Sequence, residues 1–91
     1  MSEKKRFLDA LQRASQNAKL LDNFLCDLLT DDEYSELVTR WRIVRELQHG
    51  KAQRRIAAGL GVGIATVTRG SKMLKNKKGG FQKILQTYEN I

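Results

Sequence analysis

The chain has 91 residues, a formal net charge of +7 and no proline, and all seven of its glycines lie in the second half. This length suits one small domain, and this composition favours helices almost throughout. The single cysteine excludes an internal disulfide. The polar MSEKKRF start does not indicate a signal peptide, and no apolar run approaches the roughly 20 residues of a membrane span.

Two amphipathic helices are predicted in the first thirty residues. Residues 4–17 place apolar side chains on one face at helical spacing, namely Phe7, Leu8, Leu11 and Ala14. Residues 18–29 form a more apolar run, with Leu20, Leu21, Phe24, Leu25, Leu28 and Leu29. Cys26 lies inside this second run, so we expect it to be a small buried apolar residue.

A third helix begins at a clear start signal. Thr30 and Glu33 have the spacing of a capping box, and the acidic residues of this segment suit the positive end of a helix dipole. The helix is predicted to run to about His49 and to end at Gly50. Its expected inward stripe, widened by one further residue, consists of Tyr34, Leu37, Val38, Trp41, Val44, Leu47 and Ile43.

The stretch around which the chain is organised contains two short predicted helices, at about 52–60 and 63–75, joined by a tight turn at Gly61. Small or apolar side chains fall where two steeply crossing helices need them, at Ile56, Ala57, Leu60, Val62 and Val67. This pattern is typical of a helix-turn-helix unit, which lays its second helix in the major groove of DNA.

A basic connector at 76–80 precedes a last predicted helix, marked by Phe81, Ile84, Leu85 and Tyr88. The chain is thus predicted to be all-α, with six helices. Several of these helices carry more apolar surface than so short a chain can bury against itself. We therefore expect a homodimer, and an interlocked dimer is one form it can take.

The positive charge is concentrated in the second half of the chain. Residues 50–91 carry nine basic residues and one acidic residue, whereas residues 1–49 carry eight basic and nine acidic ones. This asymmetry indicates a polyanionic partner, most simply double-stranded DNA, and a cytoplasmic protein associated with the nucleoid when bound. An enzyme is not expected, because His49 is the only histidine and no nucleophile–base set, metal-ligand spacing or phosphate loop is present.

Three segments resemble the tryptophan operon repressor (Trp repressor) family: LLTDDE at 28–33, TRWRIV at 39–44 and, above all, GIATVTRGS at 63–71. The resemblance implies a single Trp-repressor-like domain over residues 1–91, whose six helices intertwine with those of a second copy. Residues 1–50 and 80–91 would form the dimerisation core, and residues 51–75 the DNA-binding head. The implied function is transcriptional repression, with L-tryptophan as corepressor, no other cofactor, and a palindromic operator as the DNA partner.

The resemblance also implies a tryptophan site made by Arg40, Arg69, Leu29, Thr30, Gly70 and Met73. Arg40 and Arg69 match the arginines that flank the indole, and Arg69 also pairs with the ligand carboxylate, which suits a guanidinium fork. Leu29 and Thr30 match the backbone segment, supplied by the partner chain, that meets the amino group. Gly70 matches a small residue that leaves room beside the ring.

Four positions depart from the family pattern. Met73 stands where the typical member has a serine that hydrogen-bonds the ligand's amino group, and a thioether accepts hydrogen bonds only weakly. Asp31 replaces a proline, Ala57 replaces a basic residue, and the turn after Gly50 is one residue shorter. Weaker tryptophan binding, a different small aromatic effector, or no effector at all therefore remain alternatives for a helix-turn-helix regulator.

The predicted DNA-binding residues are Arg54, Gly63, Ile64, Ala65, Thr66, Thr68 and Lys72. Ile64, Ala65 and Thr68 resemble positions that face base edges, partly through water. The methyl groups of Ile64 and Ala65 can meet a thymine methyl, and the Thr68 hydroxyl can bond a base or water. Arg54 matches a phosphate-binding arginine of the first helix in the unit. Lys72 is also a candidate for a phosphate contact, and further candidates are Lys51, Arg55 and Lys75.

Overall fold

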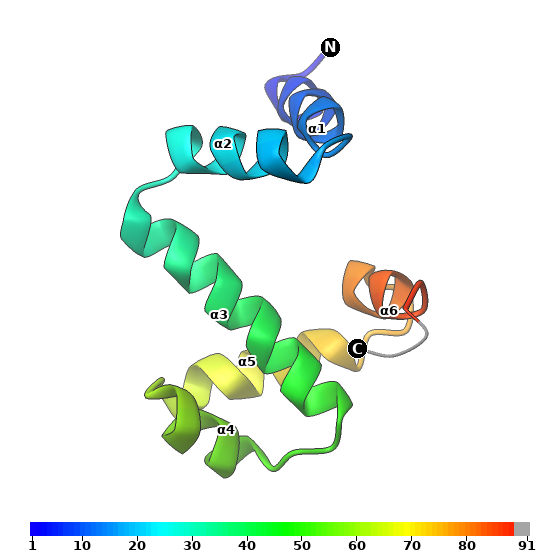
Figure 1. Cartoon of the computed structure of the whole chain (residues 1–91). Coiled ribbons are helices and arrows are strands. Elements are labelled where there is room, and N and C mark those ends of the chain that lie inside the picture. The colour runs from blue at the N-terminus through cyan, green and yellow to red at the C-terminus, as the bar shows by residue number, and fades with distance from the viewer. Residues whose placement is uncertain (89–91) are drawn as a thin grey trace. The chain divides into compact units, whose positions relative to one another are not determined.

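The computed structural model describes residues 1–88, in which six helices and no strands are found (Figure 1). The helices are α1 (Glu3–Ala14), α2 (Ala18–Leu28), α3 (Asp31–Gln48), α4 (Gln53–Leu60), α5 (Ile64–Leu74) and α6 (Gly80–Leu85). The prediction of an all-α chain with six helices is confirmed. The chain divides into two compact units, an N-terminal unit of residues 1–36 and a C-terminal unit that begins at Leu37.

α1 and α2 meet at a sharp break. α1 ends at Ala14, three residues before the predicted end, because Asn17 caps α2 instead of continuing α1. The Asn17 Oδ1 atom accepts hydrogen bonds from the amides of Lys19, at 2.9 Å, and Leu20, at 3.1 Å. Asparagine is among the strongest N-cap residues, so this side chain sets where α2 begins.

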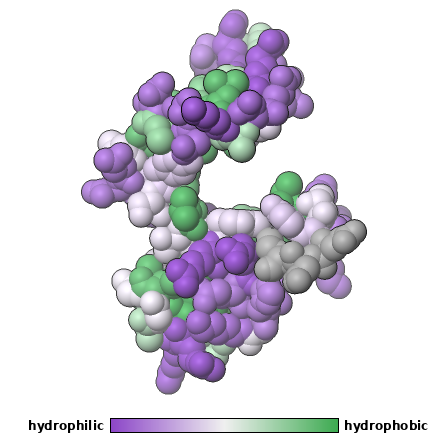
Figure 2. Space-filling model, viewed as in Figure 1, coloured by the Kyte–Doolittle hydropathy of each residue, from purple (hydrophilic) through white to green (hydrophobic). Residues whose placement is uncertain are grey.

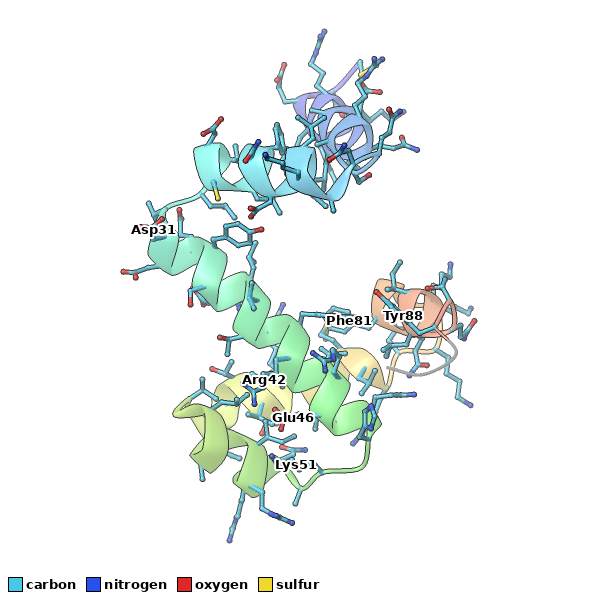
Figure 3. The ribbon with its side chains drawn as sticks, viewed as in Figure 1. Asp31, Arg42, Glu46, Lys51, Phe81 and Tyr88 are labelled. Atoms are coloured by element: carbon cyan, nitrogen blue, oxygen red, sulfur yellow. The ribbon has the colours of Figure 1, made fainter. Side chains whose placement is uncertain are left out.

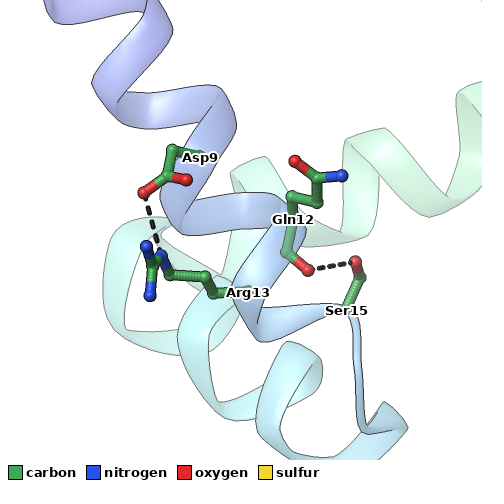
Figure 4. A network of polar contacts seen from close by, with 4 residues as sticks. All are labelled: Asp9, Gln12, Arg13 and Ser15. Carbon is green, nitrogen blue, oxygen red and sulfur yellow. Dashed lines mark hydrogen bonds and ion pairs between the residues drawn. The ribbon is translucent and has the colours of Figure 1, made fainter.

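The last turn of α1 is held by two polar contacts (Figure 4). The Nε of Arg13 donates to Asp9 Oδ2 at 2.9 Å, and the Ser15 hydroxyl donates to the carbonyl oxygen of Gln12 at 2.8 Å. The first contact is an i,i+4 pair on an exposed helix face, and the second satisfies one of the carbonyl groups left without a partner at a helix end.

The apolar residues predicted on α1 and α2 are only partly covered in the single chain, since Phe7, Leu8, Leu20 and Leu28 are exposed. A shallow apolar hollow lies between the helices and is lined in part by Leu11, Leu21 and Leu25. Cys26, predicted to be buried, is exposed. It follows Leu25 on the helix, so it is rotated by about 100° from the packed face, and its Sγ lies 3.7 Å from Asp22 Oδ1.

The predicted capping box at the start of α3 is confirmed. The Glu33 amide donates to Thr30 Oγ1 at 3.2 Å, and the Thr30 amide donates to Glu33 Oε1 at 2.9 Å. The hydrogen bond from the Thr30 amide lowers the pKa of the Glu33 carboxyl below its ordinary value. In the next turn the Tyr34 hydroxyl donates to Asp22 Oδ1 at 2.8 Å, which raises the pKa of Tyr34.

The capping box gives a pH-dependent contribution to stability. Because the folded-state pKa of Glu33 is lowered, its contribution is present above the unfolded pKa near 4.5 and is lost as the pH falls through the folded value. We expect Glu33→Gln to lower the free energy of unfolding at pH 7 and to have little effect near pH 3, measured by urea denaturation across this range. Asp32→Asn is the control, since it removes a first-turn acid without breaking the box. A Glu33→Gln effect that stays constant with pH would contradict this account.

The C-terminal unit is built on two apolar clusters. Ile43, Ile56 and Val67 are buried together, with Leu47, Ala57, Leu60 and Val62 packed around them. Val44, Leu74 and Leu85 form the second cluster, joined by Trp41 and Phe81. The predicted core positions of α4 and α5 are thus confirmed. The predicted inward stripe of α3 holds only in part, because Leu37 and Val38 are largely exposed in the single chain.

The last helix is shorter than predicted. α6 ends at Leu85, and its terminal turn is closed by the Thr87 hydroxyl, which donates to the carbonyl of Ile84 at 2.6 Å. Tyr88, predicted to lie on this helix, follows it and is half exposed. The predicted dimerisation segment 80–91 extends past the described residues at 89–91. Within residues 1–88, no helix is long and apolar enough to cross a membrane.

Candidate functional site: the α4–α5 unit and the cavity behind it

α4 and α5 are joined by a turn that depends on glycine. Gly61 has φ of +66°, in the left-handed region that favours glycine. The amide of Val62 donates to the carbonyl of Ala57 at 3.1 Å, and both of these side chains pack on the buried Ile56 and Val67. The turn is therefore fixed both by its backbone and by the apolar cluster beneath it, and α4 and α5 pack against each other (Figure 1).

The N-terminal half of α5 faces solvent. The predicted base-facing residues Ile64, Ala65 and Thr68 are exposed, as is Thr66. Gly63 caps the helix without a side-chain hydrogen bond, and Ala52 does the same for α4. By contrast, side chains cap the first helices of the chain. The first amides of α4 and α5 can therefore donate to an external acceptor.

One contact between the two helices was not predicted. The Thr68 hydroxyl donates to Gln53 Oε1 at 2.9 Å, across the crossing of α5 and α4. Gln53 is the first residue of α4, and nothing in the spacing of the sequence brings it beside Thr68. Because the hydroxyl proton is used in this bond, Thr68 can only accept hydrogen bonds from an external partner.

A cavity of about 190 Å³ lies between α3 and α5, lined by Arg40, Ile43, Val44, Thr66, Arg69, Gly70, Met73 and Phe81. Four of the six residues predicted for the tryptophan site are therefore brought together. Leu29 and Thr30 do not line this cavity. They lie at the junction of α2 and α3, in the N-terminal unit, so their predicted contribution from a partner chain stays a prediction.

Gly70 has a second role beyond the predicted one of leaving room for a ring. A Cβ atom at this position would lie 3.3 Å from Ile43 Cγ2 and 3.6 Å from Leu47 Cδ1. The first distance is tighter than ordinary van der Waals contact, so the absence of a side chain lets α5 approach α3 closely. The same close approach brings Arg69 and Met73 to the cavity.

The cavity contains an aromatic wall that the sequence did not reveal. Phe81 reaches it from α6 (Figure 3) and packs against Trp41, with ring centroids 6.1 Å apart at an interplanar angle of 54°. Trp41 does not line the cavity, which agrees with its predicted place in the core. Thr66, predicted as a DNA contact, also lies in the cavity wall. The cavity thus presents apolar and aromatic groups together with two guanidinium groups.

The basic residues of the α4–α5 unit differ in their surroundings. Arg54, Arg55, Lys72 and Lys75 are exposed. Lys51 is instead engaged by a carboxylate, because its Nζ lies 2.7 Å from Glu46 Oε1. Hydrophilic surface covers much of the C-terminal unit in Figure 2. The unit therefore offers exposed positive charge beside exposed helix amides, a combination that suits phosphate groups.

Comparison with a protein-family model and comparison with individual proteins both point to Trp repressors. The model of the family described as Trp repressor protein matches residues 2–89. The chain is 52% identical over 68 residues to a Trp operon repressor homolog of Vibrio vulnificus (strain YJ016), which covers 74% of this chain and 67% of the relative. Homologs with the same name from Vibrio cholerae and Photobacterium profundum are 46% and 43% identical over 77 residues, covering 84% of this chain and 74% of each relative.

Proposed function

Because this chain belongs to the Trp repressor protein family, a family of transcriptional repressors rather than enzymes, we propose that it binds an operator in duplex DNA as a homodimer, with L-tryptophan as corepressor. One observation carries this proposal. α5 lines the cavity through Thr66, Arg69, Gly70 and Met73 and exposes Ile64, Ala65 and Thr68 to solvent. A ligand in the cavity therefore touches the same helix that would touch DNA.

In the proposed complex, α5 is the recognition helix of a helix-turn-helix unit and lies in the major groove. The methyl groups of Ile64 and Ala65 meet thymine methyls, and Thr68 accepts a hydrogen bond from a base or a bridging water. These residues make few direct hydrogen bonds, so the shape of the duplex supplies much of the specificity.

Phosphate groups are bound around this helix. Arg54 and Lys72 supply charge, and the absence of a side chain at Gly63 lets the backbone at the start of α5 approach the duplex. Thr66 adds a hydroxyl near the same end of the helix. The exposed positive charge of this unit explains why the basic residues of the chain are concentrated after residue 50.

Tryptophan in the cavity links α3 to α5. The Arg69 guanidinium pairs with the ligand carboxylate, the Arg40 guanidinium stacks on the indole, and Phe81 closes the apolar side. Two guanidinium groups repel each other unless an anion lies between them, so the ligand favours the arrangement in which α5 is held against α3. The backbone at Leu29 and Thr30 of a partner chain receives the amino group.

The homodimer is supported by apolar side chains that the single chain leaves exposed. They include Phe7, Leu8, Leu20, Leu28, Leu37, Val38, Ile84 and Tyr88. Their positions agree with a dimerisation core made from residues 1–50 and 80–91, with residues 51–75 as the DNA-binding head. A second copy that covered these side chains would remove their apolar surface from water.

The proposal is tested by selecting duplexes from a random library with 1 mM L-tryptophan and mapping the bound sequence by footprinting. We expect two inverted half-sites about 34–36 Å apart, one helical turn, since each subunit presents one recognition helix. A single half-site at saturating protein would contradict the dimer. Failure to enrich any duplex would contradict DNA binding altogether.

Met73 favours a second candidate function, a helix-turn-helix regulator that answers to another small aromatic effector or to none. Its thioether lines the cavity and cannot donate a hydrogen bond. If tryptophan is the effector, we expect Met73→Ser to tighten tryptophan binding about fivefold, the value of one added hydrogen bond, in calorimetric titrations. Met73→Leu is the control and should leave the affinity for tryptophan nearly unchanged. Absence of heat with either protein would favour the second candidate.

A further inference from the structure

At the C-terminus of α3, Glu46 and Lys51 are joined twice, once through the backbone and once through their side chains. Gly50 has φ of +85°, its amide donates to the carbonyl of Leu47 at 3.0 Å, and the amide of Lys51 donates to the carbonyl of Glu46 at 3.1 Å. This pair of backbone bonds is the Schellman arrangement, in which the third-last helical residue and the second residue past the cap usually make an apolar contact.

In this chain, the usual apolar contact at the end of α3 is replaced by an ion pair. Lys51 Nζ donates to Glu46 Oε1 at 2.7 Å, and Arg42 Nε lies 3.5 Å from Glu46 Oε2 (Figure 3). The Glu46 side chain is only 20% exposed, and its Oε2 has no hydrogen-bond partner among the described residues. The hydrogen bond from Lys51 lowers the pKa of the Glu46 carboxyl.

The end of α4 shows that the charged contact is specific to α3. There the same backbone bond joins Val62 to Ala57, after Gly61, and both side chains are apolar and packed in the core. The two glycine-terminated helices of the C-terminal unit therefore use one backbone motif with two kinds of side-chain contact. A charged contact at a half-buried site can be weakened by a single substitution without removing apolar packing.

We propose that Lys51 is a positioning residue rather than a phosphate contact: held by Glu46, it fixes the direction in which the chain passes from α3 into α4, and hence the orientation of the α4–α5 unit. α3 carries Arg40 and α5 carries Arg69, so the ion pair sets the geometry through which a ligand in the cavity acts on the recognition helix. This inference rests on the proposed function and assigns Lys51 a role opposite to the one predicted from its charge.

The surroundings of Lys51 support this role. A Cβ placed on Gly59 of α4 would lie 4.0 Å from Lys51 Nζ, so the lysine head group lies beside α4 as well as beside α3. Glu46 holds the ammonium, and Arg42 supports the carboxylate from the preceding turn. One side chain from the connection between α3 and α4 therefore touches or approaches both helices.

The first test compares the salt dependence of DNA binding for Lys51→Met and Arg54→Met on the selected duplex. A residue that neutralises one phosphate contributes about 0.9 to the slope of log K against log [salt]. We expect Arg54→Met to reduce the slope by about this amount. Lys51→Met should leave the slope unchanged but lower the gain in DNA affinity caused by tryptophan about threefold. A slope reduced in Lys51→Met as in Arg54→Met would overturn the proposal.

The second test does not depend on DNA. Amide hydrogen exchange of the free protein should rise in Lys51→Met and in Glu46→Gln at the first hydrogen-bonded amide of α4, that of Ile56, which donates to the carbonyl of Ala52 at 3.1 Å; α6 serves as the internal reference. The double variant Glu46→Lys/Lys51→Glu should restore protection, because it restores an ion pair in the same place. Unchanged exchange in the single variants would overturn the positioning role. If the wild-type protein binds no duplex, the proposed function fails, and this second test still decides the role of Lys51.

Discussion

Replacing Arg69 with alanine should abolish the response of DNA affinity to L-tryptophan while leaving the protein folded. The side chain is exposed on one side and lines the cavity on the other, so its removal leaves no buried void. A charge-assisted hydrogen bond is worth about 1.5–3 kcal/mol, so we expect tryptophan affinity to fall at least about tenfold. Calorimetric titration measures this loss, and circular dichroism checks that the variant is helical.

Arg55→Ala provides the matched control for Arg69→Ala. Both variants lose one exposed positive charge from the same unit, but Arg55 does not line the cavity. Arg55→Ala should therefore bind tryptophan as the unmodified protein does. An Arg69→Ala protein that still bound DNA more tightly with tryptophan would show that the cavity is not the effector site.

Replacing Ile56 with alanine should lower the free energy of unfolding by about 2–5 kcal/mol, which is a large part of the stability of a small domain. Ile56 is fully buried against Ile43 and Val67, where α3, α4 and α5 meet. Truncation leaves a cavity that close-packed neighbours fill only in part. Urea denaturation followed by circular dichroism measures this change.

Ile64→Ala makes the same chemical change in an exposed place. Ile64 is 48% exposed at the start of α5. The free energy of unfolding of the variant should therefore lie within about 0.5 kcal/mol of that of the unmodified protein. It should nevertheless weaken binding to the selected duplex, since a methyl-bearing contact to a base is lost. Equal destabilisation by the two substitutions would mean that Ile64 is packed in the protein and not presented to DNA.

The helices and much of the core could be predicted because local patterns determine them. The capping box at Thr30 and Glu33 is a local signal, and so is the glycine turn at Gly61. Ile56 and Val67 were predicted as buried because the spacing of apolar residues on two short helices leaves few ways to pack them. Each of these features depends on residues close in sequence, where the spacing of apolar residues and the residues that form turns indicate the local structure.

The features that were not predicted depend on how helices meet. Cys26 lies in an apolar run, but only the packing of α1 on α2 decides which side of that run is covered. The bond between Thr68 and Gln53 depends on the crossing angle of α5 and α4. Phe81 was predicted as a helix residue, and its place in the cavity wall depends on how α6 packs against α3.

The surroundings of a charged residue, Lys51, could not be predicted from the sequence either. The sequence places it in a strongly basic segment, which by itself favours a phosphate contact. Its partner Glu46 lies five residues earlier, on the other side of Gly50, and the left-handed conformation of that glycine brings the two together. A count of charges along the sequence therefore does not show that Lys51 is paired with a carboxylate.

We propose that a ligand in the cavity acts on DNA binding through one helix, α5. The most direct measurement is the affinity of the unmodified protein for a fluorescent selected duplex, by anisotropy, with and without saturating L-tryptophan. Site-to-site coupling of the usual size predicts a dissociation constant at least about fivefold lower with tryptophan. A dissociation constant that is the same in both conditions would contradict the claim.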